Sequence, residues 1–404
     1  MTSLMACGRP HRLVFVVTAL LGGCAVGPDF LKPAPPEAAG YTRELLAATA
    51  AAPVADGAAQ RFVAGLDIPG QWWTLFRSPA LNALIERALR NNPDLKAAQA
   101  ALRVAQENVA AQQGFYYPNL SGNFSASRQK NATAVIAPTL TSGTPYFNLF
   151  TPQLAISYVP DVFGLNRRTV EGLVALTEAQ RYALAATYLT LTSNVVAAAV
   201  QEASLRGQIA ATRDIIAAET ELLGLFRRQL ALGQIAEVDV AGQEAALAQA
   251  ETTLPPLQKQ LAQQRDLLAA LTGALPSEEP AETFELKGLE LPQELPLSLP
   301  AQLVAQRPDV RQAEENLHQA SAQIGVAVAN RLPNLTLTGS LGTTAAQANR
   351  LFTTGTGFWS IAASLTQPIF DGGTLLHKER AARAAFEQSV AHTPLEEQHP
   401  PLHG

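Results

Sequence analysis

The chain has 404 residues, a formal net charge of −5 at pH 7 and a sequence pI near 5.8. It contains no long basic run, which argues against nucleic acid as a partner. Its two cysteines are Cys7 and Cys24, and Cys7 lies in a segment that is expected to be removed, so no internal disulfide is expected.

The amino terminus, residues 1–23, has the pattern of a secretory signal peptide. A basic cluster ending at Arg12 precedes nine mostly apolar residues, 13–21, and small residues follow. Nine residues are too few for a membrane-spanning helix, which needs about 20. We expect the chain to be exported, and we expect no later segment to be long and apolar enough to span a membrane as a helix. A membrane crossing would then have to use β-strands.

A linker is expected over residues 24–80, and a helix over 81–114. The helix is rich in Ala, Leu, Gln, Glu and Arg, which are good helix formers. Pro93 should interrupt the helix and begin a second helical segment, because proline is tolerated in a first turn but not in a helix interior.

The sequence contains an internal repeat. Residues 92–120 match residues 307–335 without a gap, and Pro93 and Pro308 show the offset of 215 residues. A second match, between Phe163 and Phe370, has an offset of 207 residues. The matches predict two copies of helix, strand, strand, helix, over 81–273 and 301–391.

Two β-hairpins are expected, over 119–160 and 334–368, with loops at 129–149 and 342–357. Apolar residues alternate there with small or hydroxyl-bearing residues, and the apolar positions include Leu120, Phe124, Leu154, Ile156, Leu335, Leu337, Leu341, Trp359, Ile361 and Leu365. Such alternation is typical of transmembrane barrel strands and also of a soluble sheet with one solvated face. The near absence of charged residues favours the membrane alternative.

A long helical hairpin is expected after the first pair of strands. Residues 165–232 contain no proline, and the second helix is expected over 238–272. Apolar residues step by seven along both segments and predict an antiparallel coiled pair with its tip near Gly233. Pro255 and Pro256 should kink the second helix. Residues 274–300 are rich in proline and glutamate and are expected to form an irregular connector.

Seven short motifs, taken in order along the chain, resemble those of a known family. They are LGGCAVGPDF (21–30), WWTLFRSPALNALIERALRNNPDL (72–95), YYPNL (116–120), DVFGLNRR (161–168), RPDVRQAE (307–314), LPNL (332–335) and QPIFDGG (367–373). Together they resemble the outer-membrane efflux lipoproteins of the TolC family, in the NodT/OprM-like branch that works with RND pumps.

The resemblance implies a membrane β-barrel joined to an α-helical barrel. Each chain would supply four transmembrane strands, and a homotrimer would close one 12-stranded barrel. The linker 24–80 and the connector 274–300 would be equatorial segments. The implied function is passive export of drugs or small molecules across the outer membrane, without catalysis or cofactor. The implied partners are a periplasmic adaptor, an inner-membrane RND pump and outer-membrane lipid.

The resemblance also implies two functional sites. LGGC is similar to a lipobox, so Cys24 would carry lipid; the alternative is an ordinary cleavage site with an incidental cysteine. The adaptor would contact the hairpin tip, at positions matching Leu232, Gly233, Gln234, Ile235 and Asp239. Gln234 departs from the apolar residue that is usual in the family. Gly233 would also serve simply to end a helix.

The second copy is expected to end early. Its last helix is predicted at 373–391, and the tail 392–404 matches nothing before it. The expected consequence is that three copies supply about half of the tunnel wall and that the chain alone does not form a sealed conduit. A different alternative is a lipid-anchored periplasmic coiled-coil scaffold without a channel. The six histidines show no metal-ligand spacing, and neither a phosphate loop nor a nucleophile elbow is present, so no enzyme activity is expected.

Overall fold

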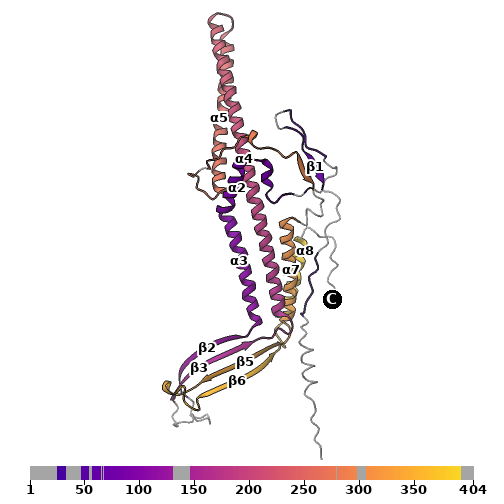
Figure 1. Cartoon of the computed structure of the whole chain (residues 1–404), viewed down its shortest axis with the longest axis vertical. Helices are drawn as coiled ribbons and strands as arrows, with labels where there is room; N and C mark the ends of the chain where they lie inside the picture. The colour runs from indigo at the N-terminus through magenta and orange to yellow at the C-terminus, as the bar shows by residue number, and fades with distance from the viewer. Residues whose placement is uncertain are drawn as a thin grey trace, which may run out of the picture. The chain divides into compact units, whose positions relative to one another are not determined.

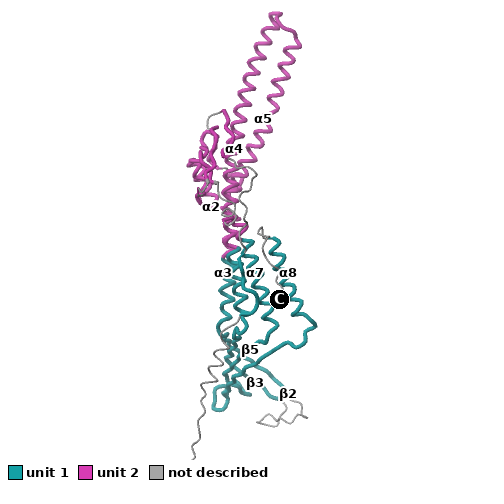
Figure 2. Tube along the Cα trace, turned by 90° about the vertical axis from the view of Figure 1, so that its right-hand side faces the viewer, with its two compact units in different colours: residues 1–34, 103–179, 312–404 teal, residues 35–102, 180–311 magenta. Residues whose placement is uncertain are grey.

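The computed structural model of the chain describes residues 25–32, 47–53, 57–64, 66, 68–130, 146–278, 280–297 and 306–392. The predicted signal peptide, Cys24 and residues 393–404 lie outside these ranges. The chain divides into two compact units (Figure 2). Unit 1 takes residues 1–34, 103–179 and 312–404, and unit 2 takes residues 35–102 and 180–311.

Unit 1 contains the same order of elements twice (Figure 1). The first series is the end of α3 (Pro93–Gln113), β2 (Asn119–Lys130), β3 (Tyr146–Tyr158) and the start of α4 (Leu165–Ala231). The second series is α7 (Pro308–Ala329), β5 (Asn334–Thr343), β6 (Gly357–Thr366) and α8 (Thr374–His392). Short 3-10 turns follow α3 at Gly114–Tyr116 and lie between β5 and β6 at Ala348–Arg350.

The strands of unit 1 form one antiparallel sheet in the order β2-β3-β5-β6. The pairing aligns the predicted apolar positions across all four strands: Leu120 pairs with Ile156, Leu154 with Leu341, and Leu341 with Trp359. Side chains alternate between the two faces of a strand, so this register gathers the apolar positions on one face. The strands extend into the predicted loops, by two residues at the end of β2, four at the start of β3, two at the end of β5 and one at the start of β6.

The core of unit 2 is built around α2 (Pro79–Asn91). Leu81, Leu84, Ile85 and Ala88 lie one turn apart on one face of α2 and are fully buried. They belong to a cluster with Trp73 from a 3-10 turn at Trp72–Phe76, with residues of α4 and with Leu268 of α5 (Glu237–Leu271). Pro93 separates α2 from α3 as predicted.

Asn92 lies between α2 and α3 and caps the second helix. Its side-chain oxygen accepts hydrogen bonds from the backbone N–H groups of Asp94 and Leu95, at 2.9 and 3.1 Å. Its amide nitrogen donates to the carbonyl oxygen of Leu271 at 3.1 Å. The side chain therefore satisfies free N–H groups of the first turn of α3 and also holds the end of α5.

The helical hairpin of unit 2 follows the predicted heptads. Ile209 and Leu223 of α4 and Val240 and Leu268 of α5 are buried, while most residues between them are exposed. This pattern is typical of an apolar seam between two helices. α5 remains helical through Pro255 and Pro256. The kink expected at these two prolines stays a prediction.

One expectation about α4 is wrong. Within the described residues, α4 has an 18-residue window with a mean hydropathy of 1.5, long and apolar enough to cross a membrane by length and composition. Core helices of soluble proteins pass the same test, and a third of this window is buried. Leu191, Val195 and Ala199 of α4 lie in the core of unit 2, which gives a packing reason for the composition.

The connector 274–300 is also more regular than predicted. It contains the strand β4 (Glu294–Leu297), which pairs in parallel with β1 (Arg61–Ala64). Arg61 and Glu294 are partners in the register, and their side chains form an ion pair at 2.8 Å. The sequence signal was weak because β4 is four residues long and contains Pro296, which normally counts against a strand.

Candidate functional site

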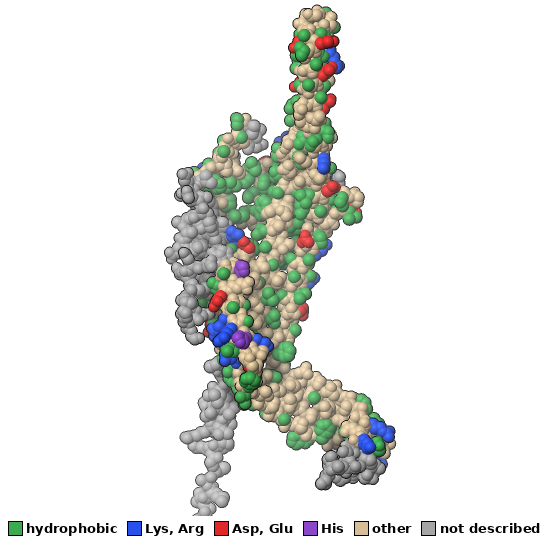
Figure 3. Space-filling view, turned by 180° about the vertical axis from the view of Figure 1, so that it is seen from behind, with side chains coloured by type: hydrophobic (Ala, Val, Ile, Leu, Met, Phe, Trp, Pro, Cys, Tyr) green, Lys and Arg blue, Asp and Glu red, His purple; other side chains and the backbone are tan. Residues whose placement is uncertain are grey.

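The first candidate surface is the apolar face of the sheet in unit 1. Its large side chains are exposed: Leu120 is 66% accessible, Leu341 61% and Ile361 82%. The only charged residues on the four strands are Arg128 and Lys130, at the end of β2 far from the helices. Figure 3 shows this distribution on the visible face, with Lys and Arg only near the outer end of the sheet. An uncharged, exposed apolar face of this size is suited to hydrocarbon.

The second feature is the pair of sheet edges. β2 and β6 are the outer strands, and within the described residues neither pairs with a strand on its outer side. β2 has 12 residues and β6 has 10, so both edges are long. Long unpaired edges present rows of free N–H and C=O groups, which are not tolerated in hydrocarbon.

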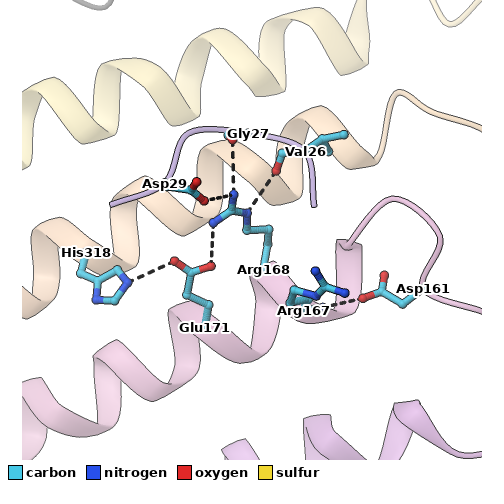
Figure 4. Close-up of polar contacts among 8 residues, drawn as sticks. All are labelled: Val26, Gly27, Asp29, Asp161, Arg167, Arg168, Glu171 and His318. Carbon is cyan, nitrogen blue, oxygen red and sulfur yellow. Dashed lines mark hydrogen bonds and ion pairs between the residues drawn. The ribbon is translucent and has the colours of Figure 1, made fainter. Parts of the chain in front are cut away.

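The third feature is the segment that follows Cys24, residues 25–32, which we call the amino-terminal strap. It lies against α4 and α7 and is held by Arg168 of α4, whose side chain is only 5% accessible (Figure 4). Arg168 donates to the carbonyl oxygens of Val26 and Gly27 at 3.1 and 3.3 Å. It also forms ion pairs at 2.8 Å with Asp29 and Glu171.

These contacts favour the charged form of Arg168. Burial alone would lower the pKa of the guanidinium, but the hydrogen bonds to Asp29 and Glu171 outweigh this effect and raise the pKa above its ordinary value. Arg168 therefore stays charged at any physiological pH. Its planar group can reach two backbone carbonyls and two carboxylates at once, which the single amine of a lysine could not do.

Glycine residues bring the strap into backbone contact with its neighbours. Gly27 has a φ of 97°, and a Cβ atom there would lie 2.4 Å from the Cα atom of Gly325 in α7. A Cβ atom on Gly325 would lie 2.8 Å from the side chain of Arg168. Both positions therefore require glycine, because a side chain would push the strap away from α7. The backbone N–H of Val26 donates to Phe163 at 3.2 Å.

His318 of α7 completes the cluster. Its Nε2 atom lies 3.1 Å from Glu171 Oε1, and its ring stacks on Phe30 of the strap with centroids 4.3 Å apart. Lys32 at the end of the strap forms an ion pair with Glu314 at 2.8 Å. Burial raises the pKa of the neighbouring Glu315 despite the nearby His318. The strap thus contacts both α4 and α7 through charged and aromatic groups.

The predicted tip residues lie in the turn between α4 and α5. Gly233 has a φ of 70°, and its N–H and that of Gln234 donate to Leu230 and Gln229 at 2.9 Å, which ends α4. Leu232 is 73% accessible, Gln234 is exposed and Ile235 is half-buried. Asp239 accepts from the N–H of Ala236 at 2.9 Å, so its carboxylate caps the start of α5.

Sequence reasoning did not find the strap cluster. Asp29 and Arg168 both occur in the motifs quoted above, but no local spacing connects two residues 139 positions apart. His318 appeared only as one of six isolated histidines. The available signal was the position of Arg168, which is the second of two adjacent arginines at the start of a helix. Positive charge is unfavourable at a helix start, so this position indicates a nearby acidic partner.

Comparison with known proteins places these features in a family. The sequence pattern of the family described as "Outer membrane efflux protein" matches residues 84–274 and 299–396. The pyoverdine export outer membrane protein OpmQ of Pseudomonas aeruginosa is 31% identical over 330 residues, which cover 80% of this chain and 68% of OpmQ. The toluene efflux pump outer membrane protein TtgF of Pseudomonas putida is 29% identical over 381 residues, covering 91% and 74%.

Solved structures have the same fold. The outer-membrane channel OprN superposes with a TM-score of 0.78 and 28% identity, covering 92% of this chain and 79% of OprN. The open state of the Neisseria gonorrhoeae MtrE outer membrane channel gives a TM-score of 0.75 and 25% identity, covering 92% and 79%.

The fold and the exposed apolar sheet define a channel-forming protein of the outer membrane. The chain belongs to the outer membrane efflux protein family. It is an outer-membrane channel component of a tripartite efflux system, and its place is the outer membrane.

Proposed function

We propose that three copies of this chain close one 12-stranded barrel, four strands from each copy, through which substrates leave passively. The observation that carries this proposal is the four-stranded sheet of unit 1, with an exposed apolar face and two unpaired edges. Four strands are too few to close a barrel, so the edges must be closed by other copies. β2 leaves the helices and β6 returns to them, so β6 of one copy can pair antiparallel with β2 of the next.

The opposite face of the sheet would line the lumen. It carries small and hydroxyl-bearing side chains, among them Ser121, Thr338, Ser340 and Ser360, and the last two are hydrogen-bonded at 2.7 Å. Such a lining is wet and uncharged, so it would not select strongly among substrates. We place substrate selection in the inner-membrane RND pump, and assign the chain no catalytic step and no cofactor.

The lipid anchor on Cys24 is part of the proposal. Ala25, the next residue, lies against Gly164 in the loop that follows β3, since a Cβ atom on Gly164 would be 2.8 Å from the Cα atom of Ala25. The strap would thus attach the lipid close to the end of the sheet, where a headgroup layer is expected. The lipid would be an accessory anchor in the leaflet, and the barrel would do the spanning.

Contact with a periplasmic adaptor is assigned to the hairpin tip. Leu232 and Val238 are each 73% accessible there, so the turn offers apolar groups to a partner. Gly233 and Asp239 would act by shaping the turn rather than by contact. The prediction that the second copy ends early stays a prediction.

The test separates the channel from the soluble scaffold alternative. Cells would produce the full chain and a Cys24→Ser variant, and membranes would be fractionated. We expect both to remain in the outer membrane and to migrate as heat-sensitive trimers in detergent gels. Release of the variant as a water-soluble monomer would overturn the barrel. A stable trimer with discrete conductance steps in planar bilayers would refute the expectation that the chain alone forms no sealed conduit.

A further inference from the structure

The two loops that join the sheet to its following helices differ in how they are covered. The loop between β3 and α4 contains Val162 and Phe163, which are half-buried, and the strap bonds to Phe163. The loop between β6 and α8 contains Ile369 and Phe370, which are 97% and 91% accessible. An adjacent pair of large apolar side chains with almost complete exposure indicates an interaction site for a protein or a membrane.

A second apolar pair lies at the same end of the sheet on the opposite edge. Phe115 and Tyr117, just before β2, are 68% and 74% accessible. Asn119 at the start of β2 pairs with Ser157 near the end of β3. The sheet order puts β2 and β6 three strand spacings apart, about 14 Å, so within one copy the two pairs are too distant to touch.

We infer that Ile369 and Phe370 of one copy dock against Phe115 and Tyr117 of a second copy. This inference rests on the proposed trimer. In a closed barrel β6 would lie beside β2 of the next copy, at one strand spacing of about 4.8 Å. β6 ends and β2 begins at the end of the sheet near the helices, so the residues after β6 meet the residues before β2.

The second copy is favoured as the occupant because both pairs flank strand edges that need a partner strand. The contact would continue the edge pairing beyond the last backbone hydrogen bond. Asp371, the nearest carboxylate in the sequence, accepts hydrogen bonds from the N–H groups of Gly373 and Leu375 at 2.8 Å, so it is occupied with the start of α8. These bonds would hold the carboxylate of Asp371 at the start of α8 rather than against the apolar groups of the second copy.

The experiment is a cross-link in the full chain. Tyr117→Cys and Phe370→Cys would be combined and treated, in outer membranes, with a short bismaleimide. We expect covalent dimers and trimers on denaturing gels. The matched control combines Tyr117→Cys with Phe352→Cys, since Phe352 is 84% accessible but lies between β5 and β6, at the other end of the sheet. This control should give no cross-link.

The outcomes distinguish the inference from the proposed function. Trimer formation would be measured separately, by mass in detergent. Trimers without the cross-link between positions 117 and 370 would overturn the docking and leave the barrel in place. The same result with Phe370→Cys protected from a water-soluble maleimide would mean that lipid covers the pair, which also overturns it. The absence of any trimer would overturn the proposed barrel itself.

A substitution gives a second readout. Phe370→Ala should lower the temperature at which the trimer dissociates in detergent gels, because the docked ring is lost. Phe352→Ala removes an equally exposed ring and should leave that temperature unchanged. An equal effect of the two substitutions would contradict the docking.

Discussion

The two halves of unit 1 have the same order of elements but are held together in different ways. In the first half, the buried Arg168 ties the strap to α4, and glycines bring the strap into contact with α7. In the second half, Arg331 after α7 pairs with Glu379 of α8 at the protein surface, and the loop before α8 leaves Ile369 and Phe370 exposed. The comparison teaches that one half is closed within its own chain, while the other keeps an apolar surface available for another copy.

Removal of the buried arginine should have the largest effect. Arg168→Met would leave Glu171 and two strap carbonyls without their donor, and we expect a loss of about 2–4 kcal/mol in the free energy of unfolding. Arg331→Met, which breaks the ion pair to Glu379 in the second half, should cost about 0.5 kcal/mol, because that arginine is half-exposed. Urea unfolding in detergent would measure both. Equal losses would remove the distinction between the two halves.

The glycine contact should come next. Gly27→Ala places a Cβ atom 2.4 Å from Gly325 at a φ of 97°, and we expect a cost of about 1–3 kcal/mol and faster proteolysis of the strap. Gly355→Ala is the matched control, because its φ is 91° but no atom lies within 4 Å of the added Cβ. In the control, the added Cβ atom causes backbone strain but no clash. The difference between the two variants in the loss of unfolding free energy therefore measures the clash. No difference would show that strap packing is unimportant.

The start of α8 should be sensitive to acid. Backbone hydrogen bonds from Leu375 and Gly373 lower the pKa of Asp371 below its ordinary value, so the folded form favours the carboxylate. Its contribution is present above the unfolded-state pKa, near 4, and is lost as the pH falls through the lowered folded-state pKa. Amide exchange at Leu375 should therefore accelerate at acid pH. Asp371→Asn should abolish this dependence, and its persistence would assign it to another group.

The smallest effect is expected at Phe370 in the isolated chain. Phe370→Ser in detergent-dissociated monomers should change the free energy of unfolding by no more than about 0.5 kcal/mol, because the ring is exposed. Phe163→Ser, in the loop covered by the strap, should cost more, since that ring is half-buried. A large loss for Phe370→Ser in the monomer would mean that its own chain already covers the ring, contrary to the comparison.

Several features were predictable because their signals are local. Alternation with a period of two placed Leu120, Leu154 and Trp359 on one face, and the strand register confirms this. Steps of seven placed Leu223 and Val240 in the hairpin seam, and both are buried. The family followed from motifs in a fixed order, and its sequence pattern covers most of the chain.

Other features were missed or wrong because their signals are weak or distant. The four-residue strand β4 contains a proline and exists by pairing with β1, far away in the sequence. The apolar window of α4 was overlooked, although its mean hydropathy is 1.5 and the helix packs into the core of unit 2. The strap was missed because its main contacts join residues 139 to 142 positions apart.

The amino-acid sequence by itself determined the strands, the helical seam and the family, since each depends on neighbouring residues that repeat with the period of a strand or a helix. Only the tertiary structure decided which of two similar loops is covered. Gly27, Asp29 and Arg168 meet because the chain returns to its own beginning after the first hairpin. Among the residues that the structure describes, no such segment covers Ile369 and Phe370, and their exposure depends on that three-dimensional arrangement rather than on any local pattern.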